Sequence, residues 1–550
     1  MADVEDLSFW HVFEAVSGVV PEREYLVAPT ARRTYREVRE RALRLASFLS
    51  DRGVGCQVPR ARLASHESGQ DHVGIYMGNR AEYVESLFGI VAARAAPANV
   101  NHRYVAAELE QLVRECGLTG LVYEAESAPA VADVAARVGS FKVLIEVGGE
   151  GSPAVAGAFS YEEIAGSGAV RPLPDTPLGE DLCVICTGGT TGLPKGVLWR
   201  QCDLLAQLIG DRHLVTGAAV DQLSDLANNL ADTPVVALIA SPLMHFAGVG
   251  TAMLLASAGA TIVLADPPRG FNAASALLAI ESERVQTMSI VGDAFAKPLL
   301  AELGGKTYDT SSLRLIQSGG SVLSARVKRD LKEALGGKVV VSEGLGSSEA
   351  GLQARSYSSE DADAGVFIPD STTRIVSEDR SRELQPTENI IGWLATAGRV
   401  PLGYLGQLDL TSRTFPSIEG RRYSIPGDLA RWRPDGRVQL LGRAATTINS
   451  GGEKIYADEV EHALRQHSGV SEVVVVGRPS ERWGSEVVAL VVPGEAFDLD
   501  AMMACAGTLL ARYKLPKDVI VVESIGRTPV GKVDYSWARS TAVASRVVGA

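Results

Sequence analysis

Short apolar runs of the kind that form buried strands alternate with amphipathic helical patterns along most of the chain. Residues 73–77 make such a run, and the next segment places apolar residues at the i, i+3, i+4, i+7 spacing of one helix face between Val84 and Val91. Residues 121–123 and 142–147 are further strand candidates. This alternation predicts an α/β protein with sheets covered by helices. Because 550 residues exceed what one core accommodates, two or more domains are expected.

The pattern changes near residue 443, after which strand and helix candidates follow one another closely. We expect a helix over residues 458–467, ended by Gly469, and strands over residues 473–476, 487–492 and 519–522. A segment of this length with its own strands and helix can form a small α+β domain. The sequence therefore predicts a large N-terminal domain of layered α/β sheets and a smaller C-terminal α+β domain.

Charge and composition restrict the class of partner. The net charge of −13 argues against a nucleic-acid binder, so any anionic ligand must be held by a local cluster of cations and N–H groups. Six cysteines do not make a disulfide framework, and we interpret Cys183 and Cys186 as packing residues inside an apolar run. The acidic start MADVEDLSFW lacks the pattern of a secretory signal, so a cytoplasmic enzyme is expected.

Residues 233–265 contain no Asp, Glu, Lys or Arg, as a membrane span would. Proline and glycine interrupt this stretch at several points and would break a continuous span. We interpret it as a strand over residues 235–240, a helix over 250–257 and a second strand over 261–265. No transmembrane segment is therefore expected, and the stretch should be the buried centre of an α/β domain.

Residues 187–197 read TGGTTGLPKGV and follow an apolar run at residues 182–186. We expect a mobile loop rather than a core strand or a helix, because the segment is mostly glycine and short hydroxyls and Pro194 lacks a backbone donor. Glycine lets N–H groups approach phosphate oxygens, threonines donate hydrogen bonds, and Lys195 supplies charge. A Walker P-loop is excluded, because Pro194 precedes the lysine and Gly196 follows it. A surface loop without a ligand remains the alternative.

Four other glycine-rich clusters carry one or two polar side chains each, as ligand-lining loops do. They are residues 317–321, 343–349, 423–428 with Gly442 and Arg443, and 527–532. Glu349 suits Mg²⁺, Asp428 suits the hydroxyls of a ribose, and Lys532 suits charge that develops on a transferring phosphoryl group. Each residue alone could be a capping acid, part of a turn or a solvated lysine, but together they match one ligand with a base, a ribose, phosphates and a metal.

This set of motifs resembles that of the adenylate-forming enzymes, and within them the acyl-CoA synthetases. The resemblance covers nearly the whole chain and includes TYREV at residues 34–38, GNR at 78–80, the phosphate loop, GGEKIY at 451–456 and the lysine at 532. It implies an adenylation domain over residues 1–442, a hinge over 443–447 and a mobile domain over 448–550. It also implies ATP, Mg²⁺ and coenzyme A as cofactor or co-substrates, and it allows a homodimer.

The resemblance implies a reaction in two halves. A small-molecule carboxylate attacks the α-phosphorus of Mg·ATP, and after a rotation of the small domain the thiol of CoA attacks the acyl-adenylate and releases AMP. The implied catalytic residues are Lys532, Thr190, Lys195, Glu349 and His245, with Glu349 and Thr190 at the metal. The implied nucleotide- and CoA-binding residues are Thr187, Gly188, Gly189, Thr191, Gly192, Gly319, Gly320, Ser321, Gly344, Leu345, Gly346, Ser347, Ser348, Asp428, Arg443, Gly451, Gly452 and Lys454.

Several positions depart from the family pattern, among them Pro426, which stands for a usual Thr before Gly427 and Asp428 and leaves the acid in place. Leu345 stands where an aromatic residue usually stacks on adenine, which removes part of a stacking energy of about 0.5–1.5 kcal/mol. Ala445 occupies a hinge position that is often Asp or Lys, and Trp199 replaces a commoner Thr. The VLWR ending is similar to a subgroup of actinobacterial acyl-CoA ligases that act on fatty acids or steroid side chains.

His245 lies in PLMHFAG, and the resemblance places it beside the carboxylate, where it gates the acyl pocket; a core histidine is the alternative. Amino-acid-activating relatives use an Asp in this segment, and none is present here, so an apolar acid is expected: a fatty acid, a steroid side-chain acid or an aromatic acid. The leading function is an acyl-CoA ligase. An acyl-AMP ligase that loads a separate carrier protein is the second candidate, and a non-catalytic nucleotide-binding protein is the third.

Overall fold

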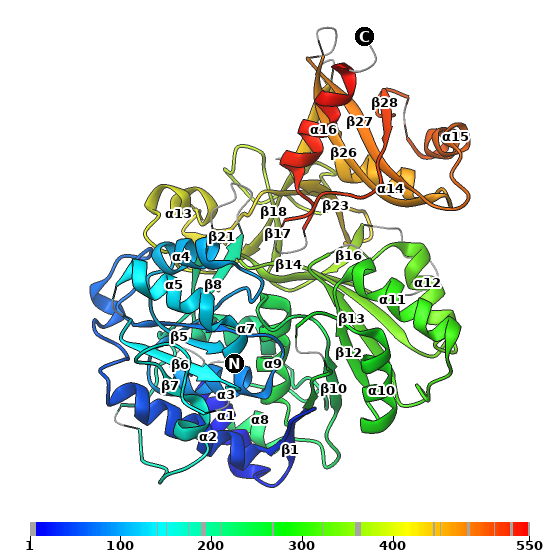
Figure 1. Ribbon diagram of the computed structural model, residues 1–550. Coiled ribbons are helices and arrows are strands. Elements are labelled where there is room, and N and C mark those ends of the chain that lie inside the picture. Colours follow the sequence, from blue (N-terminus) through cyan, green and yellow to red (C-terminus); the bar gives the residue numbers. More distant parts are fainter. Residues whose placement is uncertain are drawn as a thin grey trace. The chain divides into compact units, whose positions relative to one another are not determined.

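The computed structural model spans residues 1–550 (Figure 1). The structure describes all residues except 1–6, 140, 150, 174, 189–193, 211, 267–268, 322, 358–364, 444–445, 451–452, 481–483, 511, 529–531 and 548–550. For residues 188, 443, 449, 453, 454, 484, 546 and 547 it describes the backbone but not the side chain. The chain forms two compact units. The first contains residues 1–323, 327–353 and 396–424, and the second contains residues 324–326, 354–395 and 425–550.

The first unit contains an eight-stranded sheet in the order β19-β9-β8-β4-β3-β5-β6-β7. Its strands are β3 (His72–Tyr76), β4 (Ala96–Asn99), β5 (Leu118–Glu124), β6 (Val143–Val147), β7 (Phe159–Ser160), β8 (Leu182–Gly188), β9 (Pro194–Arg200) and β19 (Gly403–Tyr404). The pairs β8–β9 and β9–β19 are antiparallel, and the others are parallel.

A second sheet of this unit runs in the order β2-β1-β11-β10-β12-β13-β14 and is parallel from β1 onward. Its strands are β1 (Glu24–Ala28), β2 (Ala31–Thr34), β10 (Val236–Ile239), β11 (Thr261–Val263), β12 (Thr287–Ile290), β13 (Leu315–Gly319) and β14 (Val340–Ser347). Parallel sheets need cover on both faces, and helices supply it here.

Helices form three layers around these two sheets. The middle layer, whose residues share one hydrophobic cluster with strands of both sheets, contains α1 (Phe9–Val19), α2 (Tyr35–Ser50), α3 (Ala81–Ala92), α7 (Gln201–Ile209) and α9 (Phe246–Ser257). The outer face of the eight-stranded sheet is covered by α4 (Ala106–Glu115) and α5 (Ala128–Val138). The outer face of the other sheet is covered by α10 (Ala273–Glu283), α11 (Gly292–Gly305) and α12 (Ala325–Ala334), shown in green in Figure 1. The predicted α/β class is confirmed.

The stretch without charges forms β10, α9 and β11, in the order expected from its proline and glycine pattern. Of the helices in the described residues, none is long and apolar enough to cross a membrane. Leu238, Ile239, Ile262 and Val263 are at most 2% exposed, so the stretch is a buried part of the sheet.

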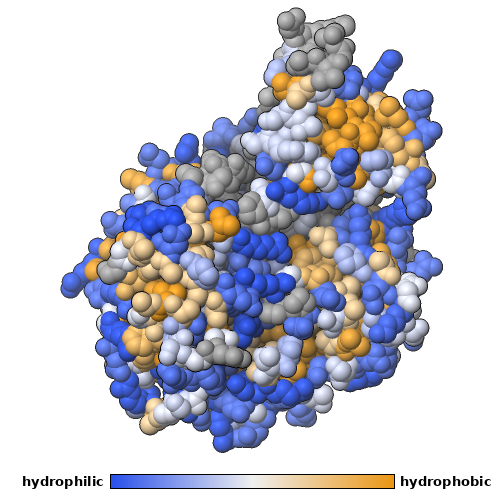
Figure 2. All heavy atoms as spheres, viewed as in Figure 1, coloured by the Kyte–Doolittle hydropathy of each residue, from blue (hydrophilic) through white to orange (hydrophobic). Residues whose placement is uncertain are grey.

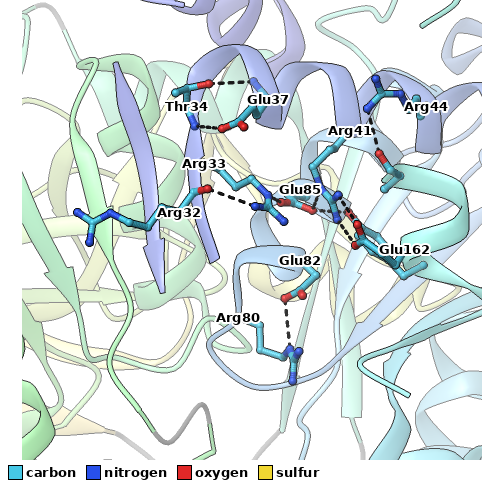
Figure 3. A network of polar contacts seen from close by, with 12 residues as sticks. Arg32, Arg33, Thr34, Glu37, Arg41, Arg44, Arg80, Glu82, Glu85 and Glu162 are labelled. Carbon is cyan, nitrogen blue, oxygen red and sulfur yellow. Dashed lines mark hydrogen bonds and ion pairs between the residues drawn. The ribbon is translucent and has the colours of Figure 1, made fainter. Parts of the chain in front are cut away.

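A network of ion pairs and hydrogen bonds joins α2 to α3 and to Glu162 (Figure 3). Thr34 and Glu37 form a capping box at the N-terminus of α2, and further along this helix the Arg41 guanidinium contacts Glu85 of α3 at 2.7 Å and Glu162 at 2.8 Å. The Tyr161 hydroxyl donates to Glu85 at 3.0 Å, and the Glu85 side chain is 1% exposed. Burial raises the pKa of Glu85, while the neighbouring Arg41 charge opposes this rise.

The second unit contains a sheet in which β27 (Gly484–Pro493) pairs with β26 (Val470–Ser480) and β28 (Asp518–Val521). Alternate residues of β26 and β27 point to opposite faces. Val473 and Val475 pack with α14 (Ala457–Arg465) and α15 (Leu499–Leu509), whereas Val474 and Val476 pack with α16 (Tyr535–Val547). Apolar residues also gather at the surface over β27 and β28 in Figure 2. Val521, the last residue of β28, is 56% exposed.

The same unit includes β16 (Val366–Pro369), β17 (Thr373–Val376), β22 (Asp428–Trp432), β23 (Val438–Arg443), the hairpin of β24 (Thr447–Ser450) and β25 (Glu453–Tyr456), and most of β18 (Ile391–Ala397). The helix and strands predicted for the C-terminal part of the chain are therefore present. The domain boundaries at 442 and 448, with a hinge between them, stay a prediction.

Candidate active site

Lys195 lies on a strand, which corrects the expectation that the whole of residues 187–197 is a loop. β8 continues to Gly188 and β9 begins at Pro194, with Thr187 opposite Lys195 in the antiparallel register. The apolar residues before and after the glycine-rich segment pair with each other as antiparallel strands, and the pairing extends to Thr187 and Lys195. The predicted phosphate-binding residues Gly189, Thr190, Thr191 and Gly192 lie outside the described residues.

The segment that carries Glu349 is held in place by hydrogen bonds from other strands to its backbone carbonyls. It follows β14 and leads into β15 (Gly351–Tyr357), and each carbonyl of residues 348–350 accepts a hydrogen bond from a side chain on a different strand. The Trp199 indole donates to Ser348 at 2.8 Å, the Ser424 hydroxyl to Glu349 at 2.7 Å and the Thr396 hydroxyl to Ala350 at 3.1 Å. These donors lie on β9, β21 (Arg421–Ser424) and β18, so the fold fixes the backbone position of Glu349.

Tyr404 connects Glu349 with Lys195. Its hydroxyl donates to Glu349 Oε1 at 3.0 Å, and the Lys195 ammonium lies 5.8 Å from the centroid of its ring. Tyr404 is only 5% exposed and belongs to β19, which pairs with the strand that carries Lys195. Two residues that are 154 positions apart in sequence, Lys195 and Glu349, therefore contact the same aromatic side chain.

The predicted adenine-binding clusters meet at the ends of two neighbouring parallel strands. Gly319 at the end of β13 pairs in register with Gly344 of β14. Gly344, Leu345, Gly346 and Ser347 belong to β14 rather than to a loop, and Gly320 and Ser321 follow directly after β13. Ligands of open α/β sheets bind beyond the carboxyl ends of such strands, so this placement is compatible with the predicted nucleotide site.

Two asparagines, the partly exposed Asn79 and the buried Asn99, hold the segment that leads to His245. The Asn79 carboxamide donates to Ile239 and Ser241 and accepts from the Leu243 N–H, and Asn99 donates to the carbonyls of Cys186 and Met244. His245 then stands at the N-cap of α9 and is partly exposed, so it is not a fully buried core histidine. Asn99 connects Cys186 at the end of the apolar run to Met244, the residue before the predicted gate His245, a contact that the sequence did not reveal.

A depression of about 530 Å³ in the first unit is lined by both aromatic and charged side chains. Its residues include Tyr76, His102, Arg103, Tyr104 and Arg269. His102 is 6% exposed, and burial, followed by the Arg269 and Arg103 charges, lowers the pKa of its imidazole to about 4.

The remaining predicted residues belong to the second unit. Asp428 at the start of β22 is the register partner of Arg443 at the end of β23. Lys454 is the partner of Asn449 in the β24–β25 hairpin, and Lys532 is exposed in a turn where the Thr528 N–H donates to its carbonyl at 2.8 Å. Gly451 and Gly452 lie outside the described residues. The convergence of these residues with Lys195 and Glu349 on one ligand stays a prediction.

The donor set fits a nucleotide-bound Mg²⁺ rather than a protein cage for a metal. Among the described residues, no group of three or more His, Cys, Asp or Glu side chains could hold a metal ion. Mg²⁺ in nucleotide sites is bound by one or two carboxylates together with substrate phosphates, so a single carboxylate at Glu349 is sufficient. Within the same described part of the chain, Glu349 Oε2 accepts no hydrogen bond and is available for such a role.

Residues 13–405 match the AMP-binding enzyme family, and residues 459–532 match the C-terminal domain of AMP-binding enzymes. The chain therefore belongs to the AMP-binding enzyme family. It is 44% identical over 537 residues to the medium-chain acyl-CoA ligase Mig of Mycobacterium avium, across 97% of this chain and 98% of that protein. It is 35% identical over 548 residues to the 3-oxocholest-4-en-26-oate–CoA ligase of Rhodococcus rhodochrous, across 97% and 95% of the two chains.

Among solved structures, the anthranilate CoA ligase AuaEII in complex with anthranoyl-AMP superposes with a TM-score of 0.80 at 21% identity, covering 99% of this chain and 98% of that one. A likeness at this identity concerns the fold alone. The family and the CoA ligases aligned along nearly the whole chain confirm the enzyme class predicted from the sequence, an AMP-forming acid–thiol ligase.

Proposed function

We propose that the protein is an ATP-dependent acyl-CoA ligase for apolar carboxylic acids. These are either medium- or long-chain fatty acids or steroids whose side chain carries the carboxylate. The observation that carries the proposal is the shared contact of Lys195 and Glu349 with Tyr404, because these are the residues that we expect to bind the phosphates and Mg²⁺. The acids named for the two relatives support the choice of substrate class.

The segment from β10 through α9 supports an apolar substrate. Residues 233–265 carry no charged Asp, Glu, Lys or Arg side chain that could pair with a polar substituent. Leu243, Met244, Val249 and Met253 are apolar residues close to His245 in the sequence, and each is at most 4% exposed. We expect some of them to border the acyl pocket and the others to belong to the core. An amino group on the substrate would lose its water without gaining a partner, which costs free energy, whereas a hydrocarbon chain would gain from burial.

In the first half-reaction, the substrate carboxylate attacks the α-phosphorus of ATP and pyrophosphate leaves. Lys195, with Thr190 and Thr191, would hold the departing phosphates, and Glu349 with Thr190 would hold Mg²⁺, which neutralises phosphate charge. Ser348 would contact the α-phosphate, Asp428 and Arg443 the ribose, and Gly319, Gly320 and Leu345 the adenine. Lys532 would stabilise the charge that develops between carboxylate and phosphate.

In the second half-reaction, the residues after 447 would rotate about the segment 443–447, withdraw Lys532 and bring Gly451, Gly452 and Lys454 to the thiol of CoA. The thiol sulfur attacks the acyl carbonyl, the bond to AMP breaks, and the thiol proton is released. The acceptor could instead be the phosphopantetheine of a separate carrier protein. Parallel assays with CoA and with a loaded carrier protein distinguish these acceptors.

The experiment is a panel of fatty, aromatic and steroid carboxylates tested with ATP, Mg²⁺ and CoA, and separately for acid-dependent exchange of pyrophosphate into ATP. We expect exchange and thioester formation with the apolar acids. Lys532→Ala should abolish adenylation but leave thioester formation from supplied acyl-adenylate largely intact, because the lysine acts only in the first half. Equal loss of both half-reactions would argue against the rotation, and no exchange with any acid would refute the ligase.

A further inference from the structure

Tyr404 is held in place by neighbouring residues and also contacts the two charged side chains of Lys195 and Glu349. It is 5% exposed, and its ring packs against Phe415 at a centroid distance of 5.4 Å. Its backbone N–H donates to the Thr411 hydroxyl at 2.9 Å, and a Cβ on the preceding Gly403 would come within 2.4 Å of Thr411. The ring is thus fixed from behind, while its hydroxyl and one face are directed at two charged side chains.

Strand register explains why this ring meets Lys195. Tyr404 is the antiparallel partner of Val197, and Lys195 lies two positions before Val197 on the same face of β9. Diagonal neighbours of this kind are within reach of an aromatic ring, and an ammonium group about 6 Å from the centroid is attracted by the ring quadrupole. The opposite end of the same side chain donates a hydrogen bond to Glu349.

The opposite charges of Lys195 and Glu349 favour a direct ion pair, and such a pair would have to break before phosphates and Mg²⁺ could bind. Among the described residues, Lys195 makes no ion pair, and the hydrogen bond to Glu349 comes from the neutral hydroxyl of Tyr404. A neutral donor orients one carboxylate oxygen without neutralising the charge that attracts the metal.

We infer that Tyr404 is a positioning residue that keeps Lys195 and Glu349 apart and oriented, so that one is ready for the phosphates and the other for Mg²⁺. The inference rests on the proposed function, because it takes Mg²⁺ and the phosphates of ATP as the ligands of these two groups. The Tyr404 hydroxyl contacts the Glu349 carboxylate and the ring contacts the Lys195 ammonium, so the two roles can be separated by substitution.

The test compares Tyr404→Phe, which keeps the ring, with Tyr404→Leu, which removes it. Tyr35→Phe is the matched control, because the buried Tyr35 hydroxyl also donates one hydrogen bond, to Ala260 at 2.8 Å, and lies on α2. ATP binding is measured by calorimetry without acid, over a range of Mg²⁺ concentrations and in EDTA, and acid-dependent pyrophosphate exchange is measured over the same range.

For Tyr404→Phe we expect the Mg²⁺ concentration at half-saturation to rise about tenfold in both assays, because the variant loses one hydrogen bond to a charged group. ATP binding in EDTA should be unchanged. Tyr404→Leu should in addition weaken ATP binding in EDTA, because Lys195 loses its ring contact. In the Glu349→Gln background, Tyr404→Phe should have little further effect on the Mg²⁺ dependence, since it acts through that carboxylate.

The inference is overturned if Tyr404→Phe shifts the Mg²⁺ dependence no more than Tyr35→Phe, or if its effect is undiminished in the Glu349→Gln background. A wild-type protein that binds Mg·ATP but shows no acid-dependent exchange refutes the proposed function, while the Mg²⁺ dependence of ATP binding still decides the role of Tyr404. A wild-type protein that binds no ATP refutes both.

Discussion

The three hydrogen bonds that hold the backbone of residues 348–350 allow a quantitative prediction. Thr396→Val and Ser424→Ala each remove one donor and little volume, and the hydroxyl-bearing residues are fully buried. Each variant leaves a backbone carbonyl with a missing partner, at a cost of about 1–3 kcal/mol in the free energy of unfolding. Trp199→Phe also leaves a gap in the core, so its cost should reach about 2–4 kcal/mol.

The effect on catalysis should follow the position of each carbonyl. Ser424 donates to the carbonyl of Glu349 itself, so Ser424→Ala should displace the carboxylate most directly. If about 1.4 kcal/mol of the loss appears as poorer transition-state stabilisation, the rate of adenylation falls about tenfold. Thr396→Val should slow adenylation less, because its hydrogen bond is one residue further on.

Urea denaturation gives the stability changes, and acid-dependent pyrophosphate exchange at saturating Mg²⁺ gives the rate of the first half-reaction. Ser257→Ala is the control, because that hydroxyl is 2% exposed and donates to the Leu254 carbonyl at 2.7 Å near the end of α9. Pairs of substitutions should combine non-additively, since the three carbonyls are consecutive. If the variants lose stability yet keep exchange rates within twofold of the Ser257→Ala control, these hydrogen bonds do not position Glu349.

Two further predictions concern buried charged groups outside the nucleotide site. Arg41→Met removes the ion-pair partner that lies 2.7 Å from the buried Glu85 carboxylate and leaves Arg33 at 3.7 Å, so it should lower the free energy of unfolding by about 3 kcal/mol in urea denaturation. Adding Glu85→Gln should recover part of this loss, and no difference from wild type would contradict a structural role for the pair of Arg41 and Glu85. The pKa of His102 is lowered to about 4 in the folded protein, below the value of about 6.5 for an unfolded chain, so the unfolded state binds the proton first and up to about 3 kcal/mol of stability should be lost as the pH falls from 6.5 to 4. His102→Gln should flatten this part of the pH profile, and an unchanged slope would show that other groups cause it.

Much of the fold could be predicted from local patterns. The strand–helix alternation and the helix and strands of the C-terminal part were visible as patterns of apolar residues, and proline and glycine divided the charge-free stretch into β10, α9 and β11. A period of this kind reports which face of a single element is buried. It also indicated α/β layers, because apolar strands without polar alternation need cover on both faces.

Local patterns misassigned the ends of the elements near the site. Glycine and proline indicated a loop over residues 187–197, but the ladder between β8 and β9 includes Thr187 and Lys195. Residues 343–347 were grouped with ligand-lining loops and belong to β14. Strand pairing supplies hydrogen bonds and side-chain contacts from a partner segment, and no single segment contains that information.

The sequence by itself determined the chemical inventory of this protein: a cation after a glycine–threonine run, a carboxylate between glycines, and a long stretch without charge. These features depend only on which residue types are present and how they are spaced. The tertiary structure alone decided that Tyr404 contacts both Lys195 and Glu349 and that Trp199, Thr396 and Ser424 hold three consecutive carbonyls. The physical reason is that these contacts join residues from strands far apart in the chain, and only packing of complete elements brings their side chains within hydrogen-bond distance.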